Sequence, residues 1–432
     1  MRSIIEIFRN GNWLPAAEFE PRGRYKSTFE YDVDYVFSAN PVPVSLTLPV
    51  GMERMGIDGE TGAQACPAFL LDLVPQGRGR KLLVQDLGLT DSEDHDLLLA
   101  QHGAFNPIGN LRLDTAVMFY QDWKRRNPED RALGFTFEDI IGRKEKFLDH
   151  IWMHGMYAAG TTGVQGAAPK FLLTQNKDGL WFADAALPDT ETAKHWLVKL
   201  PRGKDKTDVA VLRNESAYLH VAQRCGLRVE GAPIYEGEML FVPRFDRAVI
   251  DDALHRHSQE TLASLTGVLG FGIPISMFDL VESFRLHVTN PVAEISEFIK
   301  RDVLNLAMKN TDNHARNTSV QRLSDGTVRL TPVYDFAPMY LDQEMISRSC
   351  KWNTRNRVDT DDLDEIVGNL LCSETEKKEI ARGLSDFANV ISHLPETMRD
   401  CGVDQAVIDY CGPHIDAQFE RLNEVRGYGQ TP

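Results

Sequence analysis

The chain has 432 residues, of which 42% are hydrophobic and 25% are charged. This composition is typical of a globular protein with buried cores and excludes a disordered chain. The 47 basic and 63 acidic side chains give a net charge of −16. That charge argues against broad sequence-independent binding to nucleic acid, because neutralising phosphates requires a basic surface.

No secretion signal or membrane span is predicted. The start reaches Glu6 before any apolar run, and glycines interrupt the two long uncharged stretches at 150–169 and 261–278. Six cysteines occur without any Cys-x-x-Cys pair, which favours reduced thiols over a disulfide framework or a zinc site. We therefore expect a cytoplasmic protein.

The pattern divides the chain into three predicted domains, residues 1–150, 151–245 and 246–432. The first is a mixed region, with short strands expected at 29–31 and 42–48 and helical segments starting near 69–74 and 91–99. The second reads as a small sheet with one helix: strands 171–174, 180–183, 195–201 and 239–243, and a helix at 215–225. Helices dominate the third, at 281–288, 295–308, 363–390 and 403–425, around a strand pair at 318–320 and 328–331.

The strongest chemical signal is the segment 309–317, followed by 330–336. Asp312 and Asn317 are five positions apart, as in the catalytic loop of protein kinases, and Asp335 follows a predicted hairpin and precedes Phe336. Mg²⁺ bound to nucleotide phosphates needs hard oxygen ligands, which one carboxylate and one amide supply. A second carboxylate then serves the incoming hydroxyl.

The spacing alone is weak evidence. Asp122/Asn127 and Asp364/Asn369 have the same separation, but no hairpin and Asp-Phe pair follow them. The plain alternative for Asp312 and Asn317 is a polar loop that caps a hairpin.

Three further features bear on a nucleotide site. Lys199 lies inside the apolar strand 195–201, where a buried ammonium needs an anionic partner such as Glu215; an edge lysine reaching water is the alternative. The glycine-rich segment 160–170 can bring backbone amides close to phosphates, or can be a plain loop. Residues 242–247 end the small sheet where an adenine-binding hinge would join two lobes, or form a linker with a surface Arg–Asp pair.

Together these features resemble the HipA-type serine/threonine kinases, the toxin halves of bacterial toxin–antitoxin modules. The resemblance covers nearly the whole chain. It rests on the segments 29–31 and 43–49, on 69–77 with Arg80, on 244–247, on Gln259-Glu260, on 310–317 and on 330–335. It implies an α+β, two-lobed, protein-kinase-like fold with an N-terminal mixed α/β subdomain and a mostly helical C-lobe.

The resemblance also implies residue roles. Asp312 would be the catalytic carboxylate, and Asn317 and Asp335 would hold Mg²⁺. The ATP-binding residues would be Lys199, Gly160, Thr161, Thr162, Gly163, Val242, Pro243, Phe245, His314 and Arg316, with Glu215 as the partner of the lysine. Relatives often carry an autophosphorylated serine in the glycine-rich loop, and Thr161 and Thr162 occupy that neighbourhood here. Pro243 stands where relatives often have Glu.

The expected function is ATP- and Mg²⁺-dependent transfer of phosphate to a protein Ser or Thr. The family implies growth arrest, an aminoacyl-tRNA synthetase as a candidate substrate, and a small DNA-binding, HipB-like antitoxin through which nucleic acid is contacted only indirectly. The main alternative is a catalytically inactive kinase fold that serves as a partner-binding or co-repressor module. A kinase for small molecules shares the loop chemistry, whereas a metal-dependent hydrolase lacks a second histidine near the cluster.

Overall fold

The computed structural model describes residues 1–53, 64–126, 133–142, 147, 169–203, 205–353 and 359–425. The chain forms two compact units, each assembled from several segments. Unit 1 comprises residues 1–202, 236–271 and 321–326, and unit 2 comprises residues 203–235, 272–320 and 327–432. The predicted boundaries near residues 150 and 245 stay predictions.

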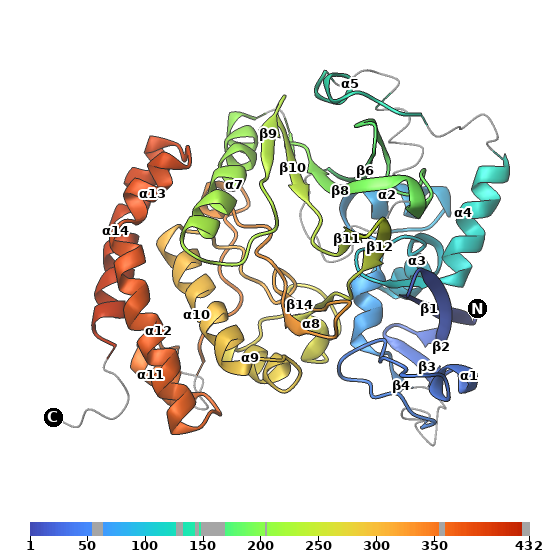
Figure 1. Cartoon of the computed structure of the whole chain (residues 1–432), viewed down its shortest axis with the longest axis horizontal. Coiled ribbons are helices and arrows are strands. Elements are labelled where there is room, and N and C mark those ends of the chain that lie inside the picture. The colour runs from blue at the N-terminus through green and yellow to red at the C-terminus, as the bar shows by residue number, and fades with distance from the viewer. Residues whose placement is uncertain are drawn as a thin grey trace. The chain divides into compact units, whose positions relative to one another are not determined.

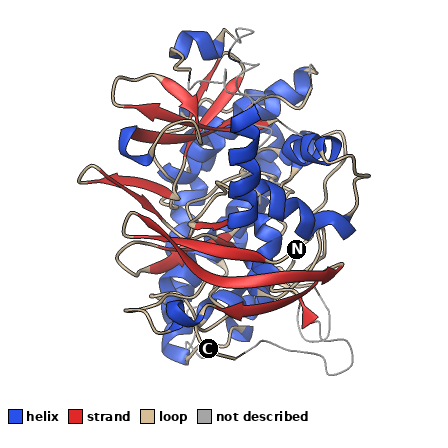
Figure 2. Cartoon of the chain, turned by 90° about the vertical axis from the view of Figure 1, so that its right-hand side faces the viewer, coloured by secondary structure: helices blue, strands red, loops and turns tan. Residues whose placement is uncertain are grey.

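An antiparallel sheet with the strand order β4-β3-β2-β1-β5 opens unit 1. Its strands are β1 (Ser3–Arg9), β2 (Asn12–Gly23), β3 (Lys26–Tyr31), β4 (Gln64–Ala65) and β5 (Leu111–Leu113). Figure 2 draws the strands of the chain in red. Asn10 and Gly11 turn β1 into β2 with positive φ angles of 48° and 78°, as a tight hairpin requires. Alternate residues of β1, among them Ile5 and Ile7, are buried in an apolar core.

Short helices complete that core. They are α1 (Val33–Val36), the 3-10 helix η1 (Ala68–Leu73), α2 (Gly77–Asp86), η2 (Glu93–His95), α3 (Asp96–Gly103) and α4 (Asp114–Arg126). The strand predicted at 29–31 and the helical segments predicted near 69–74 and 91–99 are confirmed.

The strand predicted at 42–48 is wrong. Two tyrosines hold this irregular segment instead: the Tyr35 hydroxyl donates to the Val42 carbonyl oxygen at 2.7 Å, and the Tyr31 hydroxyl donates to that of Leu48 at 2.6 Å. Pro41, Pro43 and Pro49 lack the N–H groups that a strand ladder needs. The hairpin β1–β2 was missed, although its Asn-Gly turn is a hairpin signal.

A second antiparallel sheet in unit 1 has the strand order β7-β6-β8-β10. Its strands are β6 (Lys170–Asn176), β7 (Trp181–Ala183), β8 (Thr192–Lys199) and β10 (Met239–Pro243), which confirms the predicted strands of this region. One face packs on an aromatic core that includes Trp181, Trp196 and Phe241, with α5 (Phe137–Ile141) against it. The 3-10 helix η3 (Asp189–Glu191), β11 (Arg247–Ile250), β12 (Ala253–Arg256), β13 (Glu260–Thr261) and α8 (Leu262–Leu265) complete the elements of this unit.

A buried charge network joins the second sheet to the N-terminal part of unit 1. The Arg244 guanidinium donates to Asp184 Oδ2 at 2.7 Å and to both carboxylate oxygens of Asp246. Asp246 also accepts from the Gly109 amide at 2.8 Å, and Arg247 donates to the Gly109 and Pro107 carbonyl oxygens. The alternative of a surface Arg–Asp pair at 244–247 is therefore wrong.

Ionised side chains persist in this network because each has several partners. Burial alone would raise the pKa of Asp246, but the charges of Arg244 and Arg247 hold that pKa well below its usual range. All three side chains are at most 2% exposed. Such a network requires every member, since an uncompensated buried charge is costly.

Helices dominate unit 2, as predicted. They are α7 (Lys206–Arg224), α9 (Met277–Arg285), α10 (Pro291–Ala307), α11 (Leu363–Asn369), α12 (Glu374–Ser392), α13 (Leu394–Asp400) and α14 (Gln405–Asn423), with the 3-10 helix η4 (Met339–Leu341). Helices α10, α12 and α14 pack side by side (Figure 1). The strands β9 (Ile234–Glu236) and β14 (Ser319–Arg322) lie where the chain passes between units, and β15 (Val328–Leu330) follows.

Helix α7 begins nine residues earlier than predicted. Asp205 caps it by accepting a hydrogen bond from the Thr207 amide at 2.9 Å, and it ends before Gly226, which has a φ of 80°. The sequence analysis missed this start, although Asp205 is a favourable N-cap residue and Val209 and Leu212 have helical spacing. Among the described residues, no helix combines the length and hydrophobicity that crossing a bilayer requires.

The charge network makes a stability prediction. Asp246→Asn leaves Arg244 and Arg247 buried with less compensating charge, so we expect unfolding of the variant to require about 3–5 kcal/mol less free energy than wild type. Urea unfolding followed by tryptophan fluorescence measures this difference. The exposed-pair variant Arg125→Gln should unfold close to wild type, and equal stability of both variants would contradict the role of the network.

A buried carboxyl group in the same unit predicts a pH dependence. Burial raises the pKa of Glu260 to about 7, although its oxygens accept hydrogen bonds from Ser264 and Ser45, both at 2.7 Å, and from the Leu46 amide at 2.8 Å. The folded state therefore binds this proton more tightly than the unfolded state, and ionising Glu260 costs stability as the pH rises.

Glu260→Gln removes that cost. We expect the stability of wild type relative to the variant to fall by about 3 kcal/mol as the pH rises from about 4.5 to about 7, and then to stay constant. Chemical denaturation at a series of pH values gives the difference directly. A difference that does not change across this window would contradict the raised pKa.

Candidate active site

The candidate catalytic loop starts where α10 ends. Lys309 has a left-handed φ of 56°, and the Asn310 amide donates to the Asn305 carbonyl oxygen at 2.9 Å. This is a Schellman-type helix end, a position that glycine usually fills at lower cost. It turns the chain sharply out of the helix, so that residues 310–318 form an irregular loop before β14.

The second candidate segment returns beside the first. The Thr331 amide donates to the Ser319 carbonyl oxygen at 2.8 Å, which aligns the segments on either side of the turn. The Tyr334 hydroxyl lies 2.7 Å from Ser319 Oγ and donates to the Arg316 carbonyl oxygen at 2.8 Å. Tyr334 therefore fastens the segment that carries Asp335 to the loop that carries Asp312.

A side chain within the loop fixes its curvature. Asn317 Nδ2 donates to the Asp312 carbonyl oxygen at 2.8 Å, closing a ring of six residues. This hydrogen bond from Nδ2 sets the orientation of the side-chain amide. The other amide atom, Asn317 Oδ1, is buried and has no hydrogen-bond partner among the described residues. A buried acceptor oxygen of this kind is suited to a metal ion or a water molecule.

His314 lies next to the candidate catalytic carboxylate. Its Nε2 is 3.4 Å from Asp312 Oδ1, and the Arg316 amide donates to its Nδ1 at 3.3 Å. Because Nδ1 accepts, the neutral ring carries its proton on Nε2, the nitrogen that faces Asp312. The histidine is therefore placed to orient that carboxylate.

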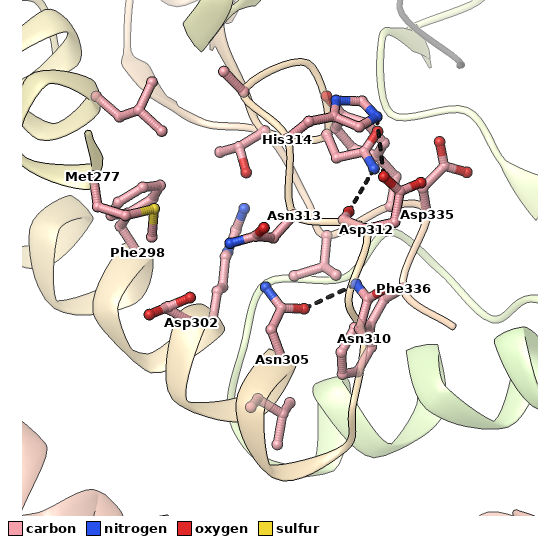
Figure 3. A pocket seen from close by; sticks show the side chains of 18 of the residues that line it. Met277, Phe298, Asp302, Asn305, Asn310, Asp312, Asn313, His314, Asp335 and Phe336 are labelled. Carbon is pink, nitrogen blue, oxygen red and sulfur yellow. Dashed lines mark hydrogen bonds and ion pairs between the residues drawn. The ribbon is translucent and has the colours of Figure 1, made fainter. Parts of the chain in front are cut away.

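Asp312, Asn317 and Asp335 line one pocket within unit 2. Figure 3 shows Asp312 and Asp335 among the residues around it. Asp335 has a left-handed φ of 50°, a strained conformation for a non-glycine residue and one that clusters at functional sites. One amide oxygen and one carboxylate match the ligands of Mg²⁺, which usually keeps several water ligands. Among the described residues, no group of three or more His, Cys, Asp or Glu side chains forms a full metal cage.

Helix α7 is anchored to both ends of the site. The Tyr218 hydroxyl donates to the Met308 carbonyl oxygen at 2.8 Å, and its ring lies 5.1 Å from that of Phe336. Both side chains are buried, with Tyr218 fully inaccessible. Glu215, on the same helix, is 6% exposed. The sequence analysis missed the anchoring roles of Tyr218 and Tyr334, since a tyrosine among apolar residues gives no separate signal.

Lys199 lies in unit 1, on the second sheet. It pairs with Leu240 across β8–β10, and Leu197 pairs with Val242. Side chains alternate along a strand and paired residues share a face, so Lys199, Leu240 and Val242 lie on the face opposite the aromatic core. Lys199 is only 3% exposed. The alternative of an edge lysine reaching water is wrong, because β8 lies between β6 and β10.

The remaining predicted nucleotide residues fall in different places. Pro243 pairs with Trp196, on the core face of the sheet, whereas Phe245 is half-buried just beyond the end of β10. Gly160, Thr161, Thr162 and Gly163 lie outside the described residues. Lys199 and Glu215 belong to different units, and their pairing stays a prediction.

The fold is α+β and kinase-like, as the sequence predicts. The chain aligns with a solved structure of the Shewanella oneidensis toxin–antitoxin system, a complex of HipA, HipB and its operator DNA, with a TM-score of 0.67 and 19% sequence identity. The alignment covers 98% of this chain and 99% of that one.

The sequence places the chain in a particular family. Residues 162–395 match the HipA-like C-terminal domain, and residues 11–114 match the HipA N-terminal domain. The chain belongs to the HipA-like family of toxin kinases. It is 26% identical over 328 residues to the serine/threonine-protein kinase toxin HipA of Shewanella oneidensis, a match that covers 70% of this chain and 68% of that protein.

Proposed function

We propose that this protein is an ATP- and Mg²⁺-dependent serine/threonine protein kinase that acts as a HipA-like toxin. One observation carries the proposal: Asp312, Asp335 and the Asn317 amide oxygen, which has no hydrogen-bond partner among the described residues, line a single pocket. A polar loop that merely capped a hairpin would have no need to leave a buried amide oxygen without a partner.

Each residue has a role in the proposed site. Asn317 and Asp335 would hold the ion, and Mg²⁺ supplies charge neutralisation at the phosphates when it is bound. Lys199 would bind the phosphates of ATP, with Glu215 as its partner. Val242 shares its face of the sheet, which supports a place for the adenine there, with Phe245 at the adjoining turn. Gly160 to Gly163 would cover the phosphates, and Arg316 would pair with one of them.

The acceptor chemistry centres on Asp312. This carboxylate would accept a hydrogen bond from the Ser or Thr hydroxyl and orient its oxygen toward the γ-phosphorus. The new bond joins that oxygen to phosphorus while the bond to the β-phosphate oxygen breaks, so ADP leaves and the hydroxyl proton passes to Asp312. His314, which faces Asp312 through its protonated nitrogen, would hold the carboxylate in the productive orientation.

The key test is Asp312→Asn. The amide cannot take the hydroxyl proton, so we expect the transfer of phosphate from labelled ATP to proteins of a cell lysate to fall at least about 100-fold. ATP–Mg²⁺ should still raise the melting temperature of this variant, since Asp312 is not expected to bind the nucleotide.

The chain provides a matched control. Asp364 and Asn369 repeat the same spacing on α11, and neither is among the residues that line the pocket. Asp364→Asn should therefore retain transfer at the level of wild type. Undiminished transfer by Asp312→Asn would reject the catalytic role, and the absence of any nucleotide-dependent stabilisation of wild type would favour an inactive partner-binding module. Mass spectrometry of the same reaction tests Thr161 and Thr162 as autophosphorylated residues.

The toxin role makes a second prediction. The structural relative is a complex of HipA with HipB and operator DNA, which supports a small DNA-binding antitoxin as the partner of this acidic chain. We expect expression of the wild-type chain in a bacterial host to arrest growth and expression of Asp312→Asn to permit it. If both the wild-type chain and Asp312→Asn arrest growth, toxicity does not depend on phosphate transfer. Labelled phosphate on a purified aminoacyl-tRNA synthetase would identify the acceptor.

A further inference from the structure

Within the described residues, neither Arg9 nor Arg322 forms an ion pair with an acidic side chain. Arg9 ends β1, Arg322 ends β14, and both are half-buried in unit 1. Across the described part of the chain, no carboxylate lies within 4.0 Å of either guanidinium, although the protein has 63 acidic residues. A partly desolvated cation without a counter-charge is unfavourable.

The two arginines lie against one short segment. Arg9 Nη1 donates to the Asn40 carbonyl oxygen at 2.7 Å, and Arg322 Nη1 donates to that of Pro43 at 3.3 Å. Asn40 and Pro43 are three residues apart, so their carbonyl groups are separated by no more than about 10 Å. The Tyr35 hydroxyl holds the same segment through Val42. Each guanidinium is therefore held at this segment by one hydrogen bond.

Most of the hydrogen-bonding capacity of these groups is unused. A guanidinium has five N–H donors, and within the described ranges each of the two side chains donates one hydrogen bond to a protein acceptor. The pKa of Arg322 is lowered, first by burial and also by the nearby charge of Arg9, despite the opposing effect of Glu260. Glu260 does not ion-pair with Arg322, and its oxygens accept instead from Ser45, Ser264 and the Leu46 amide.

We propose that Arg9 and Arg322 form a binding site for a phosphate group beside residues 40–43. Planar guanidinium groups bind phosphate through paired charge-assisted hydrogen bonds, and a doubly charged group compensates two cations at once. The ligand is either inorganic phosphate or the phosphate of a small monoester. This site uses none of the residues proposed for ATP, Mg²⁺ or the acceptor, and its existence does not depend on kinase activity.

Calorimetric titration of the full chain with inorganic phosphate tests the proposal, with chloride adjusted to keep the ionic strength constant. We expect saturable binding by wild type and binding at least about tenfold weaker in both Arg9→Gln and Arg322→Gln. Arg382→Gln, which removes an exposed arginine of unit 2, should bind as wild type does. Arg322→Lys keeps the charge and one donor group, and should lie between wild type and Arg322→Gln.

A parallel titration with O-phospho-L-serine, with L-serine as its control, distinguishes the two sources of the phosphate group. Tighter binding of phosphoserine than of phosphate identifies a monoester as the ligand, and the reverse identifies the free ion. Melting temperatures measured in the chloride buffer without phosphate show whether each variant folds. If Arg322→Gln does not fold, the binding measured for Arg9→Gln tests the proposal. The proposal is overturned if wild type shows no saturable binding at tens of millimolar phosphate, or if binding is equally strong in both glutamine variants.

Discussion

The buried charges around Arg244 are the constraint on which unit 1 depends. Arg244 donates hydrogen bonds to Asp184, just after β7 of the second sheet, and to Asp246. Asp246 also accepts a hydrogen bond from the Gly109 amide, in the N-terminal part of unit 1. Ionised groups stay buried only with their full set of partners, so these segments have one relative arrangement. The sheet that carries Lys199 is thereby built as one body with the N-terminal strands.

In unit 2, the main structural requirement is to hold the irregular loop 310–318 in one conformation. Its carboxylate and amide groups lie in a segment without helix or strand, yet the backbone is held by Tyr218, Tyr334 and Asn317. Tyr334 and Asn317 donate to carbonyl oxygens of the loop, and Tyr218 donates to that of Met308, where α10 ends. A loop constrained in this way presents Asp312 and Asp335 in fixed positions, which phosphate transfer requires because its catalysis relies on positioning.

The proposed chemistry draws on both units, with Lys199 from one and the acidic loop residues from the other. The proposed phosphate site at Arg9 and Arg322 lies wholly within unit 1. Because the net charge of the chain is −16, the attraction for an anion at this site would have to come from the local pair of cations and not from the protein as a whole. The two proposals rest on separate residues and stand or fall independently.

Local pattern was enough to predict the segments that form α9 to α12 and α14, the strands of the second sheet, and the motif from Asp312 to Asp335, because periodicity and spacing are properties of short segments. It missed α13 and the start of α7. It could not show that residues 42–48 are held by tyrosine hydroxyls rather than by a strand ladder. Nor could it show that 244–247 form a buried network or that Arg9 meets the neighbourhood of Arg322. These depend on contacts between residues far apart in the chain, and only the tertiary structure decides which charges are buried together.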